Sequence, residues 1–511
     1  MLASLKQRQR QEGKVESLPA PTGGLNTRDP ISAMDPKDAI DLENWFPTPA
    51  DLMLRQGFSD HVTGSVLGQV ESLMAYSSSS GTERLYGASG TAIYNCSSAT
   101  ATASVAVSGL DNARWEHINF TNTGGTAYLL CVNAADGLRS FDGTTWAEQA
   151  ITGASASNFA HISMHKERVW CVKDNTLDAY YLNTGAIAGT ASKLALGGFC
   201  RKGGELMATA SLTFDAGDGM DDYWVAVTSE GELIAYQGTD PSSASTWAKV
   251  GRWELGKPPS RRCFQKYAGD LLYLADDGLW PISQLITAQT QPRLALSDKI
   301  ADAVRSAMQT YRSNFGWQVL FWPRQTMVLI NVPVQAGAYQ QQYVMNSITG
   351  AWGKFSGISA NCFEIYQGNM YFGGNGLVSR FWNTFSDDGI AITGKAKQAF
   401  NYLRTKGQKQ ATMARPLLQT TGTPAVSFGV NVDFRDDDVL SALTFSQSSY
   451  GVWDTATWDS GIWGAGLTPL SNWQTVSGIG FCFAPQIRVQ SAGIETHWQA
   501  TDLVWKPGGV L

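Results

Sequence analysis

The chain has 511 residues, of which 16% are charged and 11% are aromatic, and its formal net charge at pH 7 is −6. A chain of this length can bury a large core and form more than one domain. The negative balance excludes a generally basic nucleic-acid-binding body and leaves only local basic patches to consider. Few charges, 18 Trp and 52 Gly are typical of short strands joined by many turns.

Residues 1–16 form a small basic segment with cations at Lys6, Arg8, Arg10 and Lys14. Short tails of this kind are usually solvated, and contact with DNA or with an acidic partner is the functional alternative. The segment lacks the apolar core of a signal peptide, and no later run approaches the length of a membrane span. We therefore expect a soluble protein without a membrane span.

Residues 17–60 are expected to form an N-terminal docking segment. Its first part is extended and ends at Gly23-Gly24. Asp35 followed by Pro36 predicts a short helix, because Asp caps free N–H groups and Pro suits the first helical position. Residues 51–58 return to a strand-like pattern that leads into the body of the protein.

Seven hairpin turns then follow one another along the chain. The clearest lies in Tyr267–Ile282, where Asp277-Gly278 separates two short apolar runs. The remaining turns lie at Ser89-Gly90, Asp136-Gly137, Asp174-Asn175, Glu230-Gly231, Pro323-Arg324-Gln325 and Asn375-Gly376. They recur about every 40 to 55 residues, which is typical of the blades of a β-propeller.

We therefore predict a mainly β fold: a β-propeller of about six or seven blades over residues 61–395. An irregular pair of β-sandwiches is the alternative. Residues 298–312 are expected to form an inserted amphipathic helix after Ser297 as N-cap. Residues 396–511 are expected to form a C-terminal β-rich platform that closes the chain.

The most basic part of the body begins near residue 395 and has no carboxylate among its own residues. It is a candidate for contact with DNA or with an acidic neighbouring subunit, although charge runs mostly face water. An acidic group at residues 433–438 follows, so an interface between identical subunits could use both signs. The cations are Lys395, Lys397, Arg404, Lys406, Lys409 and Arg415.

Trp453, Trp458 and Trp463 recur every fifth residue, a spacing that fits neither a helix nor one face of a strand. Sugar rings stack on indole faces, so a carbohydrate-binding strip is one interpretation. Aromatic anchors are also enriched at protein interfaces. We favour a subunit interface.

The sequence carries no recognisable catalytic motif, and we expect neither enzyme activity nor a cofactor. His161 and His165 lie four residues apart without a third metal ligand at matching spacing. The acidic loop from Asp215 to Asp222 lacks the bidentate glutamate of a calcium-binding loop. Seven scattered cysteines without a Cys-x-x-Cys pair predict free, buried thiols and folding in a reducing cytoplasm.

Both ends of the chain resemble one family. The motifs are Gly23-Gly24-Leu25, Asn44-Trp45-Phe46-Pro47, Leu54-Arg55-Gln56-Gly57-Phe58, Arg415-Pro416-Leu417, the strand-rich segment from Val426 to Phe434 and the end of the chain from Glu495 to Gly509. In this order they resemble the tail nozzle or hub proteins of short-tailed bacteriophages, including the tail tubular protein B group.

The resemblance implies a structural virion protein, assembled in the cytoplasm of a host bacterium and located in the phage tail. It implies a ring of about six copies below the portal and adaptor proteins. Such a ring would serve as conduit and valve for DNA during ejection, without sequence specificity, and could also hold tail fibres or tailspikes. The assembly contacts would come from Gly23, Gly24, Leu25, Asn44, Trp45, Phe46, Arg55, Gly57 and the three tryptophans.

Two other classes of function stay open. A glycan-active enzyme on a propeller scaffold would need carboxylates that converge in the central channel. A glycan- or receptor-binding module would use the tryptophan series without turnover.

Overall fold

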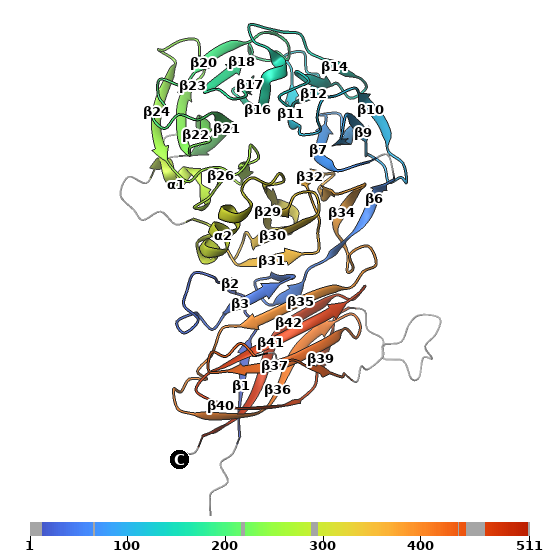
Figure 1. Cartoon of the computed structure of the whole chain (residues 1–511), viewed down its shortest axis with the longest axis vertical. Coiled ribbons are helices and arrows are strands. Elements are labelled where there is room, and N and C mark those ends of the chain that lie inside the picture. Colours follow the sequence, from blue (N-terminus) through green and yellow to red (C-terminus); the bar gives the residue numbers. More distant parts are fainter. Residues whose placement is uncertain are drawn as a thin grey trace, which may run out of the picture. The chain divides into compact units, whose positions relative to one another are not determined.

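The computed structural model describes residues 13–64, 67–215, 220–287, 295–437, 439–445 and 466–508 and is mainly β (Figure 1). The chain divides into two compact units. The first contains Met1–Gly57, Met345–Phe355 and Thr384–Leu511, and the second contains Phe58–Val344 and Ser356–Asn383. The chain therefore passes back and forth between the units.

The second unit is a β-propeller with six separate antiparallel sheets as blades. The first two blades are β7 (Val70–Ser77), β8 (Glu83–Ser89), β9 (Ala92–Asn95) and β10 (Ser104–Ser108), then β11 (Glu116–Thr121), β12 (Ala127–Val132), β13 (Arg139–Phe141) and β14 (Trp146–Glu148). The third contains β16 (Phe159–His165), β17 (Arg168–Lys173), β18 (Asp178–Tyr181) and β20 (Ser192–Ala195). The fourth contains β21 (Leu206–Asp215), β22 (Met220–Thr228), β23 (Glu232–Gly238) and β24 (Trp247–Glu254).

The ring is closed by a strand from the start of this unit. The fifth blade is β25 (Phe264–Tyr267), β26 (Asp270–Ala275) and β27 (Gly278–Pro281), and the sixth is β32 (Cys362–Tyr366), β33 (Asn369–Gly373) and β34 (Leu377–Thr384). The outermost strand of the sixth blade is β6 (Gly57–Thr63), which precedes every other strand of the ring in the sequence. Because β32 contacts β7, the last blade meets the first.

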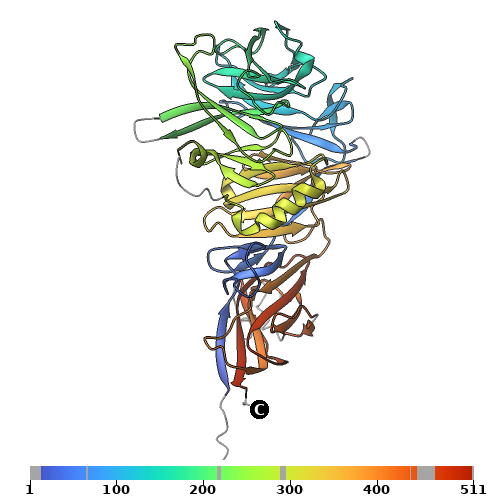
Figure 2. The same cartoon turned by 60° about the vertical axis from the view of Figure 1, so that its left-hand side comes forward.

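A further group of strands stands between the fifth and sixth blades. It consists of β28 (Gln318–Trp322), β29 (Met327–Gln335) and β30 (Tyr339–Asn346). β28 contacts β25 on one side and β32 on the other, so it occupies a place of its own in the ring. Helix α2 (Ala301–Tyr311) packs on β29 through Val304, Ala307 and Met308 (Figure 2).

All seven predicted hairpin turns are present. Six of them join the second and third strands of a blade, whereas Pro323–Gln325 forms the 3-10 turn η3 between β28 and β29. The turn residues adopt the positive φ angles that the dipeptides predict, for example 54° at Asn175 and 77° at Gly231. The prediction of a propeller is therefore confirmed.

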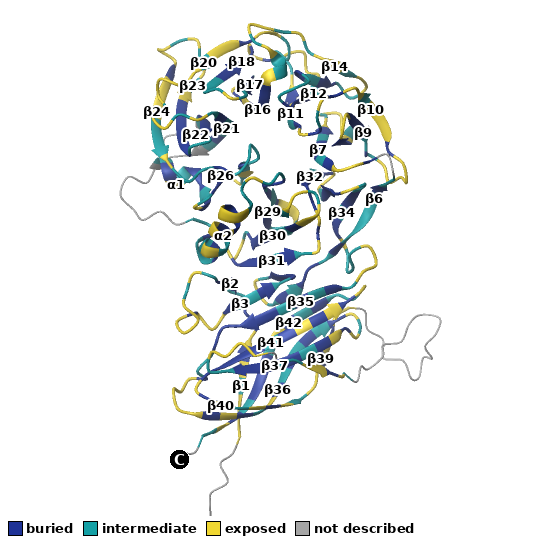
Figure 3. Ribbon diagram, in the orientation of Figure 1, coloured by how far each residue is buried: buried dark blue, intermediate teal, exposed yellow. Residues whose placement is uncertain are grey.

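The apolar cores of the propeller lie between neighbouring blades. Trp170, Trp224 and Trp247 pack together between the third and fourth blades, and the first two of these rings lie 4.6 Å apart. Figure 3 shows exposed residues on outer strands such as β10 and β24 and buried residues on the strands nearer the centre. Each blade thus buries its faces against its neighbours, as propellers do.

The first unit contains two sheets built from both ends of the chain. One has the order β39-β36-β42-β5-β4, with β1 beside β42 and β40 beside β36. The other contains β3-β35-β41-β37-β38, with β2 and β31 parallel to β3. The N-terminal strands are β1 (Lys14–Pro19), β2 (Gly24–Leu25), β3 (Asp38–Glu43), β4 (Trp45–Pro47) and β5 (Leu52–Leu54). The others are β31 (Trp352–Ser356), β35 (Ile392–Gln398), β36 (Lys409–Thr420), β37 (Ala425–Val432), β38 (Ser441–Leu443), β39 (Thr468–Ser471), β40 (Gln474–Gly480), β41 (Phe483–Ser491) and β42 (Thr496–Pro507).

The remaining elements are short. They are η1 (Ala156–Asn158), α1 (Ile282–Thr287), η2 (Asp298–Ile300) and the parallel pair β15 (Ile151–Thr152) and β19 (Gly189–Thr190).

One local prediction was wrong, and another holds in part. Asp35 does not begin a helix: its carboxylate accepts the backbone N–H of Lys37 at 2.8 Å in a turn, and β3 begins at Asp38. Ser297 stands at the predicted N-cap position, before η2, but its hydroxyl makes no capping bond and instead accepts the N–H of Leu279 at 2.9 Å. Both side chains hydrogen-bond to backbone, but tertiary pairing decides which structure the next residues adopt.

Candidate functional site

The centre of the propeller holds a cavity of about 330 Å³. Its walls come from β7, β11, β16, β28 and β32 and from the segment at the start of β25. The polar side chains on these walls include Glu116, His117, His161, Arg262, Gln318 and Glu364. Six chain segments distant in sequence thus contribute to one polar cavity.

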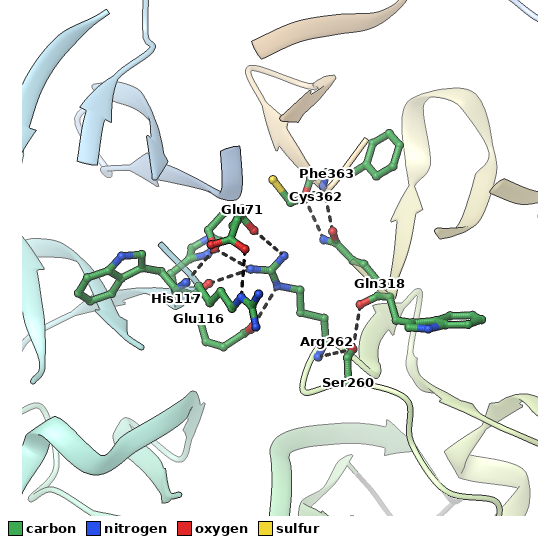
Figure 4. A network of polar contacts seen from close by, with 12 residues as sticks. Glu71, Glu116, His117, Ser260, Arg262, Gln318, Cys362 and Phe363 are labelled. Atoms are coloured by element: carbon green, nitrogen blue, oxygen red, sulfur yellow. Dashed lines mark hydrogen bonds and ion pairs between the residues drawn. The ribbon is translucent and has the colours of Figure 1, made fainter. Parts of the chain in front are cut away.

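Arg262 connects three parts of the ring across this cavity (Figure 4). Its Nε donates to Oε1 of Glu116 at 2.9 Å, and its Nη2 donates to Oγ of Ser72 at 2.8 Å. Further hydrogen bonds reach the backbone oxygens of Glu71 at 3.2 Å and Trp115 at 3.1 Å. Burial alone would lower the pKa of Arg262, but Glu116 raises it above its usual value. The guanidinium is therefore a fixed, charged connection between β7, β11 and the start of β25.

Glu364 and His117 form a second polar pair in the same cavity. Oε2 of Glu364 lies 3.4 Å from Nε2 of His117, and Oε1 accepts the N–H of Ile365 at 3.0 Å. Burial raises the pKa of Glu364 to about 8, with a further rise from Glu116, although Arg262 opposes it. Burial and Arg262 lower the pKa of His117 to about 4. At neutral pH this pair therefore carries its proton on the carboxyl group and leaves the imidazole neutral.

Gln318 holds β28 against β32 at the edge of the cavity (Figure 4). Its side-chain nitrogen donates to the carbonyl of Phe363 at 2.9 Å, and its side-chain oxygen accepts the N–H of the same residue at 2.9 Å. The side-chain amide of Gln318 thus makes the two hydrogen bonds that a strand backbone would make, and it joins β28 to β32. It serves packing, because both of its polar atoms are used.

A second cavity, also of about 330 Å³, lies on the other side of Arg262 and is lined by Arg114, Arg261 and Arg312 as well. Each of these arginines has a carboxylate partner: Arg114 pairs with Glu71, Arg261 with Asp174 and Glu205, and Arg312 with Asp276. The charges of this arginine cluster are therefore compensated and do not form a free anion site.

The N-terminal residues of the proposed assembly motif pack inside the first unit. Arg55 donates to both carboxylate oxygens of Asp387, at 2.7 and 2.6 Å, and to Oδ1 of Asn44 at 2.9 Å. Trp45 is fully buried, with its ring 6.4 Å from that of Trp498. An added Cβ at Gly57 would lie 1.9 Å from the carbonyl oxygen of Ser386.

Gly23 and Gly24 also lie at close-packed positions inside the first unit. An added Cβ at Gly23 would lie 2.2 Å from the carboxylate of Asp38, and one at Gly24 would lie 2.6 Å from the backbone of Trp352. Leu25, Asn44, Trp45, Phe46 and Arg55 are all buried within the chain. Their side chains hold the first unit together from within the single chain, and their assignment as assembly contacts stays a prediction.

Most basic residues after position 395 have carboxylate or carbonyl partners. Their partners come from distant segments, which a count along the chain cannot show. Lys395 pairs with Glu43 at 3.5 Å, Lys397 with Asp436 at 2.6 Å, Arg404 with Glu16 at 2.9 Å and Arg415 with Asp502 at 2.8 Å.

Lys409 is buried and donates to the carbonyls of Thr405, Gly407 and Phe481. Lys406 is exposed. The cations of this stretch therefore mostly stabilise the first unit. Lys6, Arg8, Arg10, Trp453, Trp458 and Trp463 lie outside the described residues.

His161 and His165 lie on β16 and do not form a metal site. His161 accepts the N–H of Thr209 at 3.4 Å, and Nδ1 of His165 lies 2.8 Å from the hydroxyl of Ser211. Burial lowers the pKa of His161 to about 3 and that of His165 to about 4. Over the ranges that the structure describes, no three His, Cys, Asp or Glu residues are grouped to hold a metal ion.

The acidic loop and the cysteines complete the predicted candidates. Asp222 accepts a hydrogen bond from Thr213 at 2.6 Å and pairs with Lys166, while the middle of its loop lies outside the described residues. All seven cysteines are free, and all except the half-buried Cys200 are buried, which confirms the expected free thiols. No helix in the described part of the chain is long and apolar enough to cross a membrane.

Sequence reasoning missed Glu116, Arg262 and Glu364. They lie on three different blades, and no local motif marks any of them. The one available signal was general: a propeller places the first strand of each blade around its axis, so polar residues on those strands meet.

No family model and no curated protein matches the chain. Among solved structures, the chain is similar to BBS1N in its complex with ARL6DN, with 10% identity, a TM-score of 0.39, and coverage of 65% of this chain and 99% of that one. It is also similar to the WD40 propeller domain of Doa1, with 8% identity, a TM-score of 0.35, and coverage of 65% and 96%. The β-propeller domain of Cps50 (Swd1) from Myceliophteria thermophila has 13% identity, a TM-score of 0.38, and coverage of 62% and 97%.

Proposed function

We propose that this chain is a structural virion protein, the tail nozzle or hub of a short-tailed phage, which assembles as a ring with the adaptor proteins above it. The observation that carries the proposal is the packing of the resemblance motifs into one unit. Trp45 from the N-terminal motif contacts Trp498 from the C-terminal one, although they stand at opposite ends of the sequence. Apart from Phe58, where the propeller unit begins, the motifs on which the resemblance depends therefore belong to one structural body.

The small size of the central cavity favours a DNA conduit that is formed between subunits over one that runs through a single propeller. Arg262 crosses the propeller centre and is held by Glu116, Ser72 and two backbone carbonyls. A cavity of about 330 Å³ on this axis has no room for a duplex. DNA would then pass through a lumen enclosed by several copies.

The charge distribution suits a lumen through which DNA slides. The net charge is −6, and the cations after position 395 are largely paired. Free lysines and arginines would hold phosphate groups through counterion release, whereas paired ones hold them weakly. Passage without sequence specificity follows from that balance.

Immunogold electron microscopy of virions from the phage that encodes this chain tests the proposal. An antibody raised against the purified chain should label the tail tip, and mass photometry of the purified chain should show a ring of about six copies. An antibody to the capsid serves as the positive control. Unlabelled tails on virions that retain their tails, with an antibody that binds the isolated chain, would refute the tail location.

The glycan-active alternative has one structural argument in its favour and one against it. Glu116 and Glu364 share a cavity, and their environments differ, as in an acid and base pair. However, Oε1 of Glu116 is bound to Arg262 at 2.9 Å, so the contact that the structure shows is a structural ion pair. Hydrolysis of host surface glycans that is lost in Glu364→Gln would favour the enzyme. Glycan binding without turnover, lost on Trp→Ala substitution at Trp453, Trp458 and Trp463, would favour the binding module.

A further inference from the structure

The central cavity contains a carboxyl group without a cationic partner. Within the described part of the chain, no lysine or arginine nitrogen lies within 4.0 Å of Glu364, and its one ion-pair neighbour is His117 at 3.4 Å. The side chain is 18% exposed and lines the cavity, so a bound molecule can reach it. Glu364 thus differs from Glu116, whose charge is already balanced by Arg262.

Most donors of the arginine and glutamine side chains on the cavity wall are already used. Arg262 donates to Glu116, to Ser72 and to the backbone of Glu71 and Trp115, and Gln318 donates to the backbone of Phe363. An anion entering the cavity would therefore meet two carboxyl groups and few free donors. The groups at this wall that can still accept are Oε2 of Glu364, once the carboxyl group is ionised, and the unprotonated nitrogen of the neutral His117 ring.

A ligand that only donates hydrogen bonds and carries positive charge complements this wall. The described residues include no group of three His, Cys, Asp or Glu that could hold a metal ion. Primary ammonium and guanidinium groups donate in several directions and need no fixed coordination number. About 330 Å³ is ample for such a group with a short alkyl chain, since a water molecule occupies about 30 Å³ in the liquid.

We propose that the propeller cavity binds an organic cation, through a primary ammonium or guanidinium group held by the carboxylate of Glu364 beside His117. The cation is either a free small molecule or a Lys or Arg side chain of a partner protein. This site is separate from the proposed role in the tail and does not depend on it.

Binding must be linked to pH, because the carboxyl group loses its proton when the cation enters. The groups that act on Glu364 are Glu116 and His117 on β11 and Arg262 at the start of β25. His161 on β16 and Arg261, which is paired with Asp174 and Glu205, also line the cavity. Both histidines stay neutral above pH 5, since burial lowers their pKa values to about 4 and about 3. With the pKa of Glu364 at about 8, the proton released at neutral pH comes from this carboxyl group.

Isothermal titration calorimetry of the full chain tests the site, with ethylammonium and ethylguanidinium as probes and ethanol as the neutral control. Both cations should bind about 100-fold more weakly at pH 6 than at pH 9, because the carboxyl group must first ionise. Glu364→Gln should weaken binding at pH 9 at least about tenfold and remove the pH dependence. This amide imitates the protonated acid, so the fold should be kept, which a thermal scan verifies.

Glu148→Gln is the matched control, because Glu148 is 61% exposed on β14 and lies outside the cavity. It should bind both cations as the wild type does. A short Gly-Ser peptide with one Arg or Lys distinguishes the sources: tighter binding than the free cation indicates a partner's side chain, and equal binding indicates a small molecule. The proposal is overturned if neither cation binds saturably at pH 9, or if Glu364→Gln binds them with wild-type affinity.

Discussion

Arg262 offers the sharpest test of how the propeller is held together. Arg262→Met removes a side chain that is only 13% exposed and bonds to two other blades. It leaves Glu116 without its partner, and the hydroxyl of Ser72 and two backbone carbonyls without their donor. Removing one member of a buried ion pair costs about 3–5 kcal/mol, mostly because the other charge stays behind. We expect a loss of unfolding free energy in that range.

A double-mutant cycle separates the lost pair from the lost packing. Glu116→Gln should cost about 1–2 kcal/mol, because the amide oxygen still accepts from the guanidinium. In the double variant no unpaired carboxylate remains, so its cost should fall below the sum of the single costs by about 1–3 kcal/mol. Urea unfolding at pH 7, followed by circular dichroism and by tryptophan fluorescence, measures each free energy.

The surface pair on α2 provides the control for this cycle. Arg305 is 56% exposed and lies 3.2 Å from Asp302, which is 61% exposed. Arg305→Met should change the unfolding free energy by about 0.5 kcal/mol or less. If Arg262→Met cost no more than this control, or if the costs of the two substitutions in the cycle simply added, the role assigned to Arg262 would be wrong.

Three further predictions concern pH and close packing. Glu364→Gln should have the stability of the wild type near pH 4.5 and exceed it as the pH rises to 8, by about 1.4 kcal/mol per pH unit. The reason is that the folded wild type keeps a proton on Glu364 up to a pKa of about 8, whereas the unfolded chain releases it near 4.5. Urea titrations at several pH values measure the difference. His497→Phe should be less stable than the wild type below pH 6.5 and approach it at high pH. Burial lowers the pKa of His497, but hydrogen bonds to Asp51 and Glu495 raise it above 6.5. The stabilisation by the charged imidazole is therefore lost as the pH rises through this raised pKa. Gly57→Ala should give little soluble protein, because its methyl group would meet the carbonyl of Ser386, whereas Gly198→Ala, with nothing within 4 Å, should behave normally.

The propeller was predictable because its signal is local. A turn dipeptide such as Asp277-Gly278 needs only its own backbone angles and the two short runs beside it. The same pattern recurs once per blade, so a repeat became visible without knowledge of any long-range contact. Even the exception has a local cause, since Pro323 marks the turn after the first strand of its group rather than after the second.

The central site was not predictable for the opposite reason. Glu116, Arg262 and Glu364 lie on different blades, and the role of each depends on the other two. The basic stretch shows the same limit: Lys397 and Arg415 look like unpaired cations in the sequence, but Asp436 and Asp502 balance them from distant positions. Charge counted along a chain does not give the charge presented by a surface.

The resemblance motif at residues 54–58 has a structural explanation that bears on how far it supports the proposed function. Arg55 is fixed within the first unit by Asp387, and the chain enters the propeller at Phe58, whose ring packs on Phe372 at 5.0 Å. These residues therefore set the start of β6, the strand that closes the ring. The contacts of this motif in the chain are structural, so the motif supports a shared architecture first. Whether the chain also lies in the phage tail is a question for the immunogold labelling experiment, because architecture alone does not determine function.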